Sequence, residues 1–330
     1  MKNFGFAAIV AAAVTAGTGA FAQDTYEMVM TNELATSHWT AKMMDDYAAK
    51  LEERSEGRID VSVFHSGTLY TDRDAIAALG TGAVHMVWPV SVNLEPIAPE
   101  YGVVNLPFSL TDNFMQSDGA VEELSEMMSA IIEGRGIRVM GLMRTADLIF
   151  LFKEQAVTKP ADLSGERVRM TGGRVLQSMM REFGASPISM PASEMAAALM
   201  QGAIDGIFTS AGGWEMVGTN AAKTASYIPG LSLLSYTIVA DDNWLNALPE
   251  DLQEIVVDTT NELVQMQWQE GIDKDKATMQ QLLDQGGELV TADDAAQAEF
   301  RSLAEKASAE FTDRFPEVWE QFQTLKAKYE

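Results

Sequence analysis

Two arginines, Arg167 and Arg169, lie in a segment that alternates like a β-strand and places both side chains on one face. A guanidinium group presents a rigid fork of N–H donors that matches a carboxylate, and such bidentate pairs are strong. Taken alone, the segment favours an exposed edge strand with solvated arginines. The glycine pair Gly172-Gly173, which opens a helix directly afterwards, favours a ligand role for Arg169.

Polar candidates also follow two other predicted strands. Arg144 comes after the apolar stretch 137–143, whose carboxyl end should reach a cleft. Thr209 and Ser210 follow a second such strand and would contribute hydroxyl groups. His38 lies at the start of the first predicted helix, where a pocket position and a solvent position fit the sequence equally well.

Aromatic side chains commonly form the apolar walls of ligand sites. Most tryptophans are core residues, so each candidate alone is more readily structural than functional. Trp88 and Trp214 stand out because they lie in or just after loops that end predicted strands. The candidate wall residues are Trp88, Trp214, Trp39 and Tyr236.

Signatures of catalysis and metal binding are missing from the sequence. It contains no G-x-S-x-G, Walker A, H-E-x-x-H or EF-hand pattern. With no cysteine and 3 scattered histidines, thiolate sites are excluded and a metal site would need help from carboxylates. A hydrolase with paired carboxylates is made improbable but is not excluded by counting. We therefore expect no cofactor, no protein metal site and no enzyme activity.

A supersecondary unit is repeated at an offset of 120 residues. Residues 77–88 run from Ala-Ala-Leu through Gly-Ala-Val to an apolar strand, and residues 197–208 repeat that order. A helix and a strand precede each copy, at residues 39–54 and 59–64 and at residues 174–183 and 187–190. Helices alternating with short buried strands imply parallel sheets. The expected fold is α/β, with two similar lobes and a ligand cleft at the strand ends between them.

A long helical pattern from Pro249 to about Leu283 would extend about 50 Å at 1.5 Å per residue. We expect it to span both lobes, with Gly271 as a point where it could bend, and a last helical run from Asp293 to be broken at Pro316. The expected division is residues 23–143 plus about 235–270 for the first lobe, and 144–234 plus about 271–330 for the second. Hinges would lie near residues 143–146 and 232–238.

Residues 1–22 have the form of a cleavable secretory signal. A positive start at Lys2 precedes a short apolar run and the A-x-A site Ala20-Phe21-Ala22. No later stretch approaches the length of a membrane span, so the expected location is the periplasm, without membrane insertion. The formal net charge of −25 argues against nucleic acid and anionic membranes as partners. It also means that an anionic solute would need local arginines.

Residues 167–210 combine these features in one order: an arginine strand, a short helix, a second strand, a second helix and a third strand. The order and its residues, Arg-Val-Arg-Met-Thr-Gly-Gly and later Met-Gln-Gly-Ala-Ile-Asp-Gly, resemble the central signature of the DctP-like, TRAP-type substrate-binding proteins of tripartite ATP-independent periplasmic transporters. The resemblance implies that Arg169 clamps a substrate carboxylate and that Arg144 is a second pocket arginine. Thr209 replaces an asparagine of several relatives, and Ala192 replaces an aromatic residue of some sugar-acid-binding ones.

The function implied by this resemblance is that of an extracytoplasmic receptor. It would bind a small organic acid and deliver it to the membrane permease subunits of a TRAP transporter. A periplasmic sensing module of a signalling system is the main alternative, and an enzyme acting on an organic acid is the weakest. The sequence leaves open whether the solute is a dicarboxylate, keto acid, sugar acid, aromatic acid or sulfonate, whether a metal bridges it, and whether the protein oligomerises.

Overall fold

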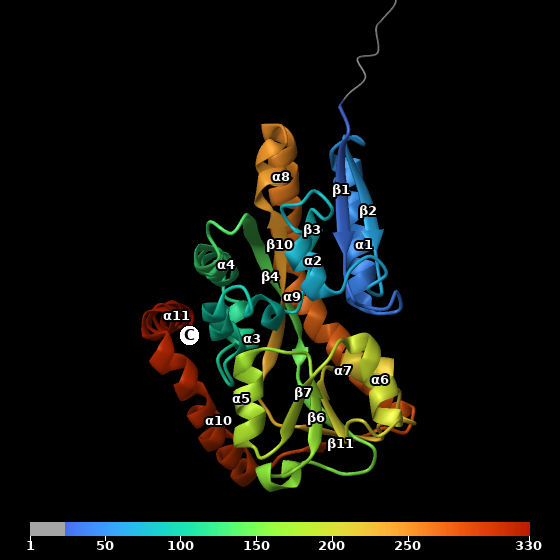
Figure 1. The fold of residues 1–330 in the computed structure, drawn as a ribbon, viewed down its shortest axis with the longest axis vertical. Coiled ribbons are helices and arrows are strands. Elements are labelled where there is room, and N and C mark those ends of the chain that lie inside the picture. The colour runs from blue at the N-terminus through green and yellow to red at the C-terminus, as the bar shows by residue number, and fades with distance from the viewer. Residues whose placement is uncertain (1–23) are drawn as a thin grey trace, which may run out of the picture.

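The computed structural model describes residues 24–330, so the predicted signal segment 1–22 lies outside the described residues. Two sheets lie one above the other in Figure 1, and we call the halves built on them lobe I and lobe II. The predicted two-lobed α/β fold is confirmed. Among residues 24–330, no helix combines the length and the apolar character needed to cross a bilayer.

Lobe I contains a five-stranded sheet in the order β2-β1-β3-β10-β4. The first three strands are mutually parallel, and β10 runs antiparallel to both of its neighbours. The strands are β1 (Tyr26–Thr31), β2 (Ile59–Phe64), β3 (Met86–Val87), β4 (Ile137–Asp147) and β10 (Leu233–Asp241).

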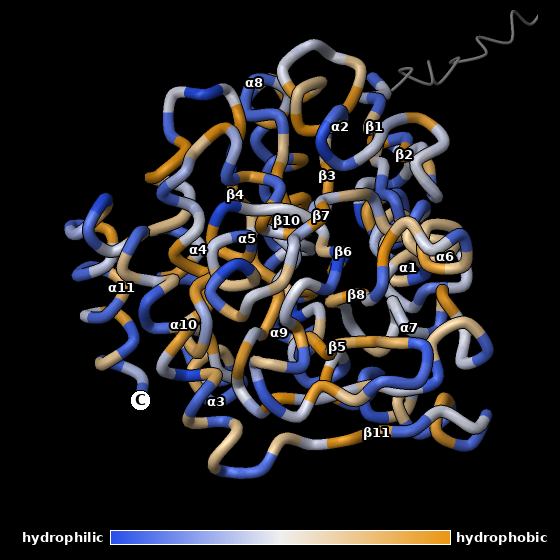
Figure 2. Tube along the Cα trace, turned by 60° about the horizontal axis from the view of Figure 1, so that its bottom comes forward, coloured by the Kyte–Doolittle hydropathy of each residue, from blue (hydrophilic) through white to orange (hydrophobic). Residues whose placement is uncertain are grey.

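Lobe II contains a six-stranded sheet in the order β11-β9-β5-β8-β6-β7. Here β6, β7 and β8 are parallel, and β5 runs antiparallel to β8 and β9. The strands are β5 (Ile149–Phe152), β6 (Arg167–Met170), β7 (Ser186–Ser189), β8 (Gly206–Thr209), β9 (Thr224–Tyr227) and β11 (Glu288–Thr291). Hydrophobic residues follow one another along central strands such as β5, whereas hydrophobic and hydrophilic residues alternate along the outer helix α11 (Figure 2).

The repeated unit of the sequence is a repeated topology in the structure. The order β2-β1-β3 in lobe I corresponds to β7-β6-β8 in lobe II, with one helix in each crossover. Its second helices begin at Asp72 and at Ala192, which differ by 120 in number. The crossover helices are α1 (Trp39–Arg54) and α2 (Asp72–Ala78) in lobe I, and α5 (Arg174–Glu182) and α6 (Ala192–Met200) in lobe II.

The long helix α9 (Glu250–Asp284) runs from lobe I to lobe II (Figure 1). Val264 and Trp268 on its first part belong to the core of lobe I, whereas Leu282 near its end belongs to a core cluster of lobe II. The helix is continuous through Gly271. A Cβ atom there would lie 3.4 Å from the Cβ of Arg144, so this glycine lets α9 approach β4 closely.

The C-terminal helices α10 (Asp294–Arg314) and α11 (Pro316–Tyr329) divide between the lobes. Phe300 of α10 is buried in lobe II, but Phe322 of α11 is buried in lobe I, with its ring 6.3 Å from that of Phe114. This corrects the predicted boundary, which gave residues 271–330 to lobe II. Pro316 starts a new helix, and α11 then packs against α4.

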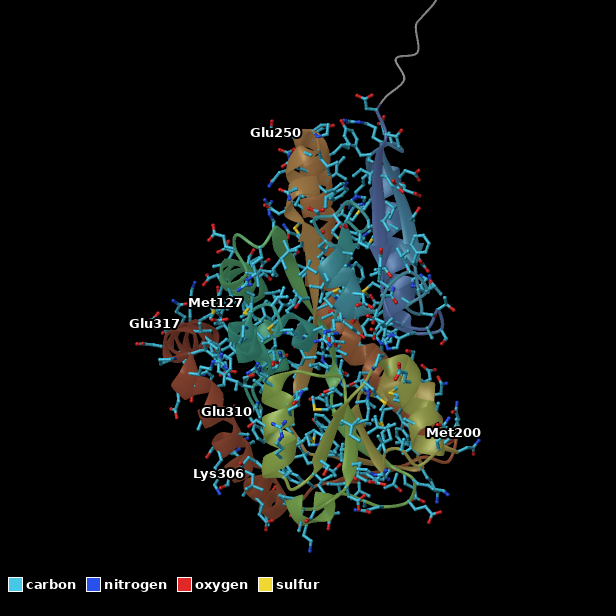
Figure 3. The ribbon with its side chains drawn as sticks, viewed as in Figure 1. Met127, Met200, Glu250, Lys306, Glu310 and Glu317 are labelled. Atoms are coloured by element: carbon cyan, nitrogen blue, oxygen red, sulfur yellow. The ribbon has the colours of Figure 1, made fainter. Side chains whose placement is uncertain are left out.

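The exposed side chains of Lys306 and Glu310 on α10 and of Glu317 on α11 mark the outer side of this pair (Figure 3). The remaining helices are short. They are α3 (Asp112–Met115), α4 (Ala120–Ile131), α7 (Ala211–Val217) and α8 (Asp242–Ala247), with 3-10 turns η1 (Ser91–Leu94), η2 (Pro99–Asn105) and η3 (Pro160–Leu163).

Candidate functional site

A cavity of about 50 Å³ lies between the lobes, at the strand ends where α/β sheets bind ligands. A wider groove of about 490 Å³ adjoins it, and Glu33 and Thr171 line both. The cavity is lined from lobe I and the connecting strands by Asn32, Glu33, Leu34, His38, Asp72, Trp88, Val90, Thr145, Leu148, Leu234 and Tyr236, and from lobe II by Arg169, Thr171, Ala192, Met195, Thr209, Ser210, Gly213 and Met216.

Arg169 of β6 is 1% exposed and lines this cavity. Its Nε and Nη2 atoms donate to the carbonyl oxygen of Met190 at 3.1 and 2.8 Å. Within residues 24–330 no protein acceptor takes the N–H groups of the other edge, formed by Nη1 and the second proton of Nη2. Burial lowers the pKa of Arg169 to about 10, and the charge of Glu33 opposes that effect. The group is therefore a buried cation at neutral pH, with one edge available to an anion.

Two carboxyl groups of lobe I, Glu33 and Asp72, line the same cavity, and we call them the carboxyl pair. The backbone N–H of Asp72 donates to Oε1 of Glu33 at 2.9 Å. Burial, followed by the negative charge of Glu33, raises the pKa of Asp72 to about 8. Burial also raises the pKa of Glu33, although the N–H of Asp72 and the charge of Arg169 act against it.

Three buried polar atoms of cavity-lining residues have no hydrogen-bond partner among the residues that the structure describes. They are Oδ1 of Asp72, Nε1 of Trp88 and Oγ1 of Thr145. Buried polar groups in folded proteins are nearly always paired, so each of these atoms needs an explanation. Their common position at the cavity indicates that a bound molecule or water completes their hydrogen bonding.

Thr209 and Ser210 reach the cavity because the start of α7 packs closely on them. Ser210 is the N-cap of α7, and its Oγ accepts from the N–H of Gly213 at 3.0 Å. A Cβ atom on Gly213 would lie 2.0 Å from Oγ1 of Thr209, so no larger residue fits there. Both residues line the same cavity as Arg169.

His38 and Tyr236 bring ring systems from lobe I, the second of them on β10, to the cavity. His38 caps α1, and its Nδ1 accepts from the N–H of Thr40 at 3.2 Å. Burial lowers the pKa of His38 to about 4, so its ring is neutral at neutral pH. Burial raises the pKa of Tyr236, which keeps its hydroxyl protonated. Neither group brings a charge to the cavity.

The predicted role of Arg144 is corrected by its surroundings. Its guanidinium does not line the cavity and instead pairs with Asp112, Asp147 and Asp275 at 2.7, 2.9 and 3.5 Å. Burial acts to lower the pKa of Arg144, but these carboxylates outweigh it and raise the pKa. With three protein carboxylates already bound, Arg144 holds the junction between β4, α3 and α9.

Two of the four aromatic candidates also lie elsewhere. The indole N–H of Trp214 donates to the carbonyl oxygen of Ala222 at 2.7 Å, and its ring belongs to a core cluster of lobe II. Trp39 lies in a separate groove between α1 and α9. The predicted pocket is therefore corrected at both residues. The face of α1 that carries Trp39 turns toward α9, and the face of α7 that carries Trp214 turns toward the core. Trp88 and Tyr236 do line the cavity.

The carboxyl pair was not among the predicted site residues. Asp72 opens α2, and an acidic residue in the first turn of a helix is readily explained by the helix dipole, so its type alone does not mark a site. The available signal was position, because Glu33 follows β1 and Asp72 opens the helix after β2, at the ligand edge of the sheet. Among residues 24–330, no group of three or more His, Cys, Asp or Glu side chains is placed to hold a metal ion.

The family model described as bacterial extracellular solute-binding protein, family 7, matches residues 30–314. The chain belongs to this family. The predicted resemblance to DctP-like, TRAP-type substrate-binding proteins is thereby confirmed. The match takes in both lobes and every residue that lines the cavity.

Curated relatives of this family 7 protein include the C4-dicarboxylate-binding periplasmic protein DctP of Rhodobacter capsulatus, which is 26% identical over 62% of this chain and 63% of its own length. A solute-binding protein of Chromohalobacter salexigens is 25% identical over 86% of this chain and 83% of its own.

Solved structures give the same fold. A TRAP periplasmic solute-binding protein from Desulfovibrio salexigens with bound orotic acid superposes with a TM-score of 0.86 at 18% identity, over 93% of this chain and 100% of its own. One from Sulfurospirillum deleyianum with bound succinate gives 0.83 at 19% identity, over 93% and 100%.

Proposed function

We propose that this family 7 protein is the solute receptor of a TRAP transporter and binds a small organic carboxylate without transforming it. The observation that carries the proposal is Arg169, a buried cation with one guanidinium edge turned to a cavity between the lobes. Relatives named for C4-dicarboxylates, and solved neighbours with bound succinate or orotic acid, support the choice of a carboxylate.

The proposed cycle is closure of the two lobes around the solute. Arg169 belongs to lobe II, whereas His38 and Trp88 belong to lobe I, so a solute that touches all three stabilises the closed arrangement. The strands β4 and β10 join the sheets near residues 143–146 and 232–238 and serve as hinges. The loaded receptor then delivers its solute to the membrane permease subunits, and residues 1–22 direct the chain to the periplasm.

The first test is a thermal-shift screen of residues 23–330, stripped of bound solute by unfolding and refolding, against carboxylates, sulfonates, polyols and amines. A solute at 100 times its dissociation constant stabilises the folded state by about 2.7 kcal/mol. Hits confined to acids support the proposal. Hits confined to neutral or purely cationic compounds contradict it.

The second test compares two arginines of one strand by calorimetry on an acid found in the screen. Arg169→Lys keeps the charge but loses the bidentate fork, and hydrogen bonds to charged groups contribute about 1.5–3 kcal/mol, so affinity should fall roughly 10- to 100-fold. Arg167→Lys is the matched control, because Arg167 is 44% exposed and pairs with Asp205 away from the cavity. Equal affinities in the two variants would remove Arg169 from its role.

A further inference from the structure

The charges around the cavity come from opposite lobes. Arg169 of lobe II is the only described residue lining it that is a cation at neutral pH, because burial keeps His38 neutral. Lobe I contributes the carboxyl pair, Glu33 and Asp72. A solute held by Arg169 through a carboxylate therefore has carboxyl groups facing another part of it.

We propose that the solute is a small zwitterion, whose carboxylate pairs with Arg169 and whose cationic nitrogen lies against Asp72 and Glu33. This inference rests on the proposed function, because it takes the carboxylate to be at Arg169.

Hydrogen bonding around the cavity agrees with such a solute. Asp72 is 5% exposed, and its Oδ1 lacks a well-aligned hydrogen-bond partner within residues 24–330, although the backbone N–H groups of Val90 and Glu33 lie near enough to act against the rise in its pKa. A carboxylate oxygen accepts hydrogen bonds, and an ammonium or iminium N–H group supplies them. The indole N–H of Trp88, also without a partner there, is a donor that suits a solute oxygen. A solute that completes these hydrogen bonds must therefore carry both acceptor oxygens and N–H donors.

A short dicarboxylate fits the same surroundings poorly. Its second carboxylate would lie against the carboxyl pair and would force both Glu33 and Asp72 to keep their protons, because a like charge nearby disfavours the ionised form. Arg144, the second arginine that would neutralise it, is already bound by Asp112, Asp147 and Asp275. Arg73 and Arg174 line the adjoining groove and not the cavity, so a dianion would have to be long enough to leave the cavity to reach them.

The size and walls of the cavity limit the solute further. A volume of about 50 Å³ corresponds to roughly three to five water positions at about 10–15 Å³ each. The rest of the lining is mixed: aliphatic side chains (Leu34, Val90, Leu148, Met195, Met216 and Leu234) alternate with polar ones (Asn32, His38, Thr145, Thr171, Thr209, Ser210 and Tyr236). A compact amino acid suits a small volume of this kind better than a polyhydroxylated sugar acid does.

Binding of a zwitterion should release a proton. Asp72 faces Glu33 from the end of β1, Asn93 from η1 and Tyr236 from β10, and burial with the charge of Glu33 raises its pKa to about 8. Glu33 in turn faces Arg169 of β6, Asp74 of α2 and Glu194 of α6. Asp72 is thus largely protonated near pH 7, and a cationic nitrogen beside it lowers its pKa. A dianion in the same place would raise that pKa and release nothing.

The test is calorimetry with acids matched in skeleton, in two buffers of different ionisation enthalpy at pH 7. Alanine, β-alanine, 4-aminobutyrate and proline are compared with propionate, butyrate, cyclopentanecarboxylate and succinate. We expect at least one zwitterion to bind 10-fold or more tightly than its partner without nitrogen, with proton release. Asp72→Asn should weaken that zwitterion at least 10-fold and abolish the release.

The control variant is Asp60→Asn, an exposed carboxylate of β2 that lines neither the cavity nor the adjoining groove, which should change affinity less than about 2-fold. Glu33→Gln is the second variant should Asp72→Asn fail to fold. Tighter binding of the acids without nitrogen, or binding of no zwitterion, overturns the inference. In the first case Arg169→Lys still weakens binding of the acid, so the proposed function stands. The proposed function is rejected separately if Arg169→Lys leaves the affinity for every acid unchanged.

Discussion

Arg144 and Arg169 are two buried arginines with opposite surroundings. Their residues are 2% and 1% exposed, and both lie on strands near the junction of the lobes. Arg144 meets three carboxylates of its own chain, whereas Arg169 meets one backbone carbonyl. Burial of a cation therefore does not by itself mark a ligand site. What marks it is a guanidinium edge that the protein leaves without an acceptor.

Arg144→Met should have the largest effect on stability and little effect on binding. Removing one partner of a buried ion pair costs about 3–5 kcal/mol, because the remaining charges lose their partner in a poorly solvated place. Here three carboxylates would lose it. We expect a melting temperature lower by several degrees with solute affinity unchanged, the reverse of Arg169→Lys. Loss of affinity without loss of stability would show that Arg144 does contact the solute.

Asp275→Asn tests the surroundings of Arg144 through the pH dependence of stability. Burial raises the pKa of Asp275 to about 6, despite the attraction of Arg144, so the folded state holds this proton more tightly than the unfolded chain does. The stabilisation is full below about pH 4 and is lost as pH rises through 6, a change of roughly 1–3 kcal/mol.

Asparagine resembles the protonated acid and does not titrate. The melting temperature of Asp275→Asn should therefore exceed that of the wild type at pH 7 and match it or fall below it at pH 4. Thermal unfolding at intervals between these values measures the difference. A difference that does not vary with pH would show that the three carboxylates share Arg144 without strain.

Glu95→Gln concerns a carboxylate that joins the lobes, and its effect should be the smallest. Glu95 follows η1 in lobe I, and its Oε2 accepts from the N–H of Arg174 at the start of α5 in lobe II, at 2.5 Å. Asn105 donates to its Oε1 at 2.9 Å. A negative charge at a helix N-terminus contributes about 0.3–1 kcal/mol, so affinity should fall roughly 2- to 5-fold if closure uses this contact.

Small-angle scattering without solute provides the second readout for Glu95→Gln, since a weaker contact between the lobes should increase the radius of gyration. Asp60→Asn serves again as an exposed control. An unchanged radius together with unchanged affinity would mean that Glu95 only caps α5.

The architecture could be predicted from the sequence because its signals are local. The helix over residues 39–54 and the strand over residues 59–64 were expected with the bounds that α1 and β2 have. The repeat at an offset of 120 residues predicted two units that indeed have the same strand order. Such patterns depend on neighbouring residues and on helical or strand periodicity.

The site was predicted only in part because its decisive contacts are distant in the sequence. Arg144 and Arg169 both lie on apolar strands, and only Asp112 and Asp275, far away in the chain, make the first one structural. Asp72 does start a helix, but the cost of burying it beside Glu33 arises from the packed sheet. Trp214 follows a strand end as expected, yet the turn of α7 directs its ring into the core.

The split between α10 and α11 bears on the order in which the protein folds. Lobe I begins with β1, the first described strand, but its core is completed by Phe322, eight positions before the last residue of the 330-residue chain. During synthesis, the space in lobe I that Phe322 fills stays open until residue 322 has emerged. Neither lobe is a continuous piece of chain, so each core forms only when segments from distant parts of the sequence come together. The lobe that begins first in the sequence is thus the one whose core is completed last, the reverse of the N-terminal-first order usual for multidomain chains.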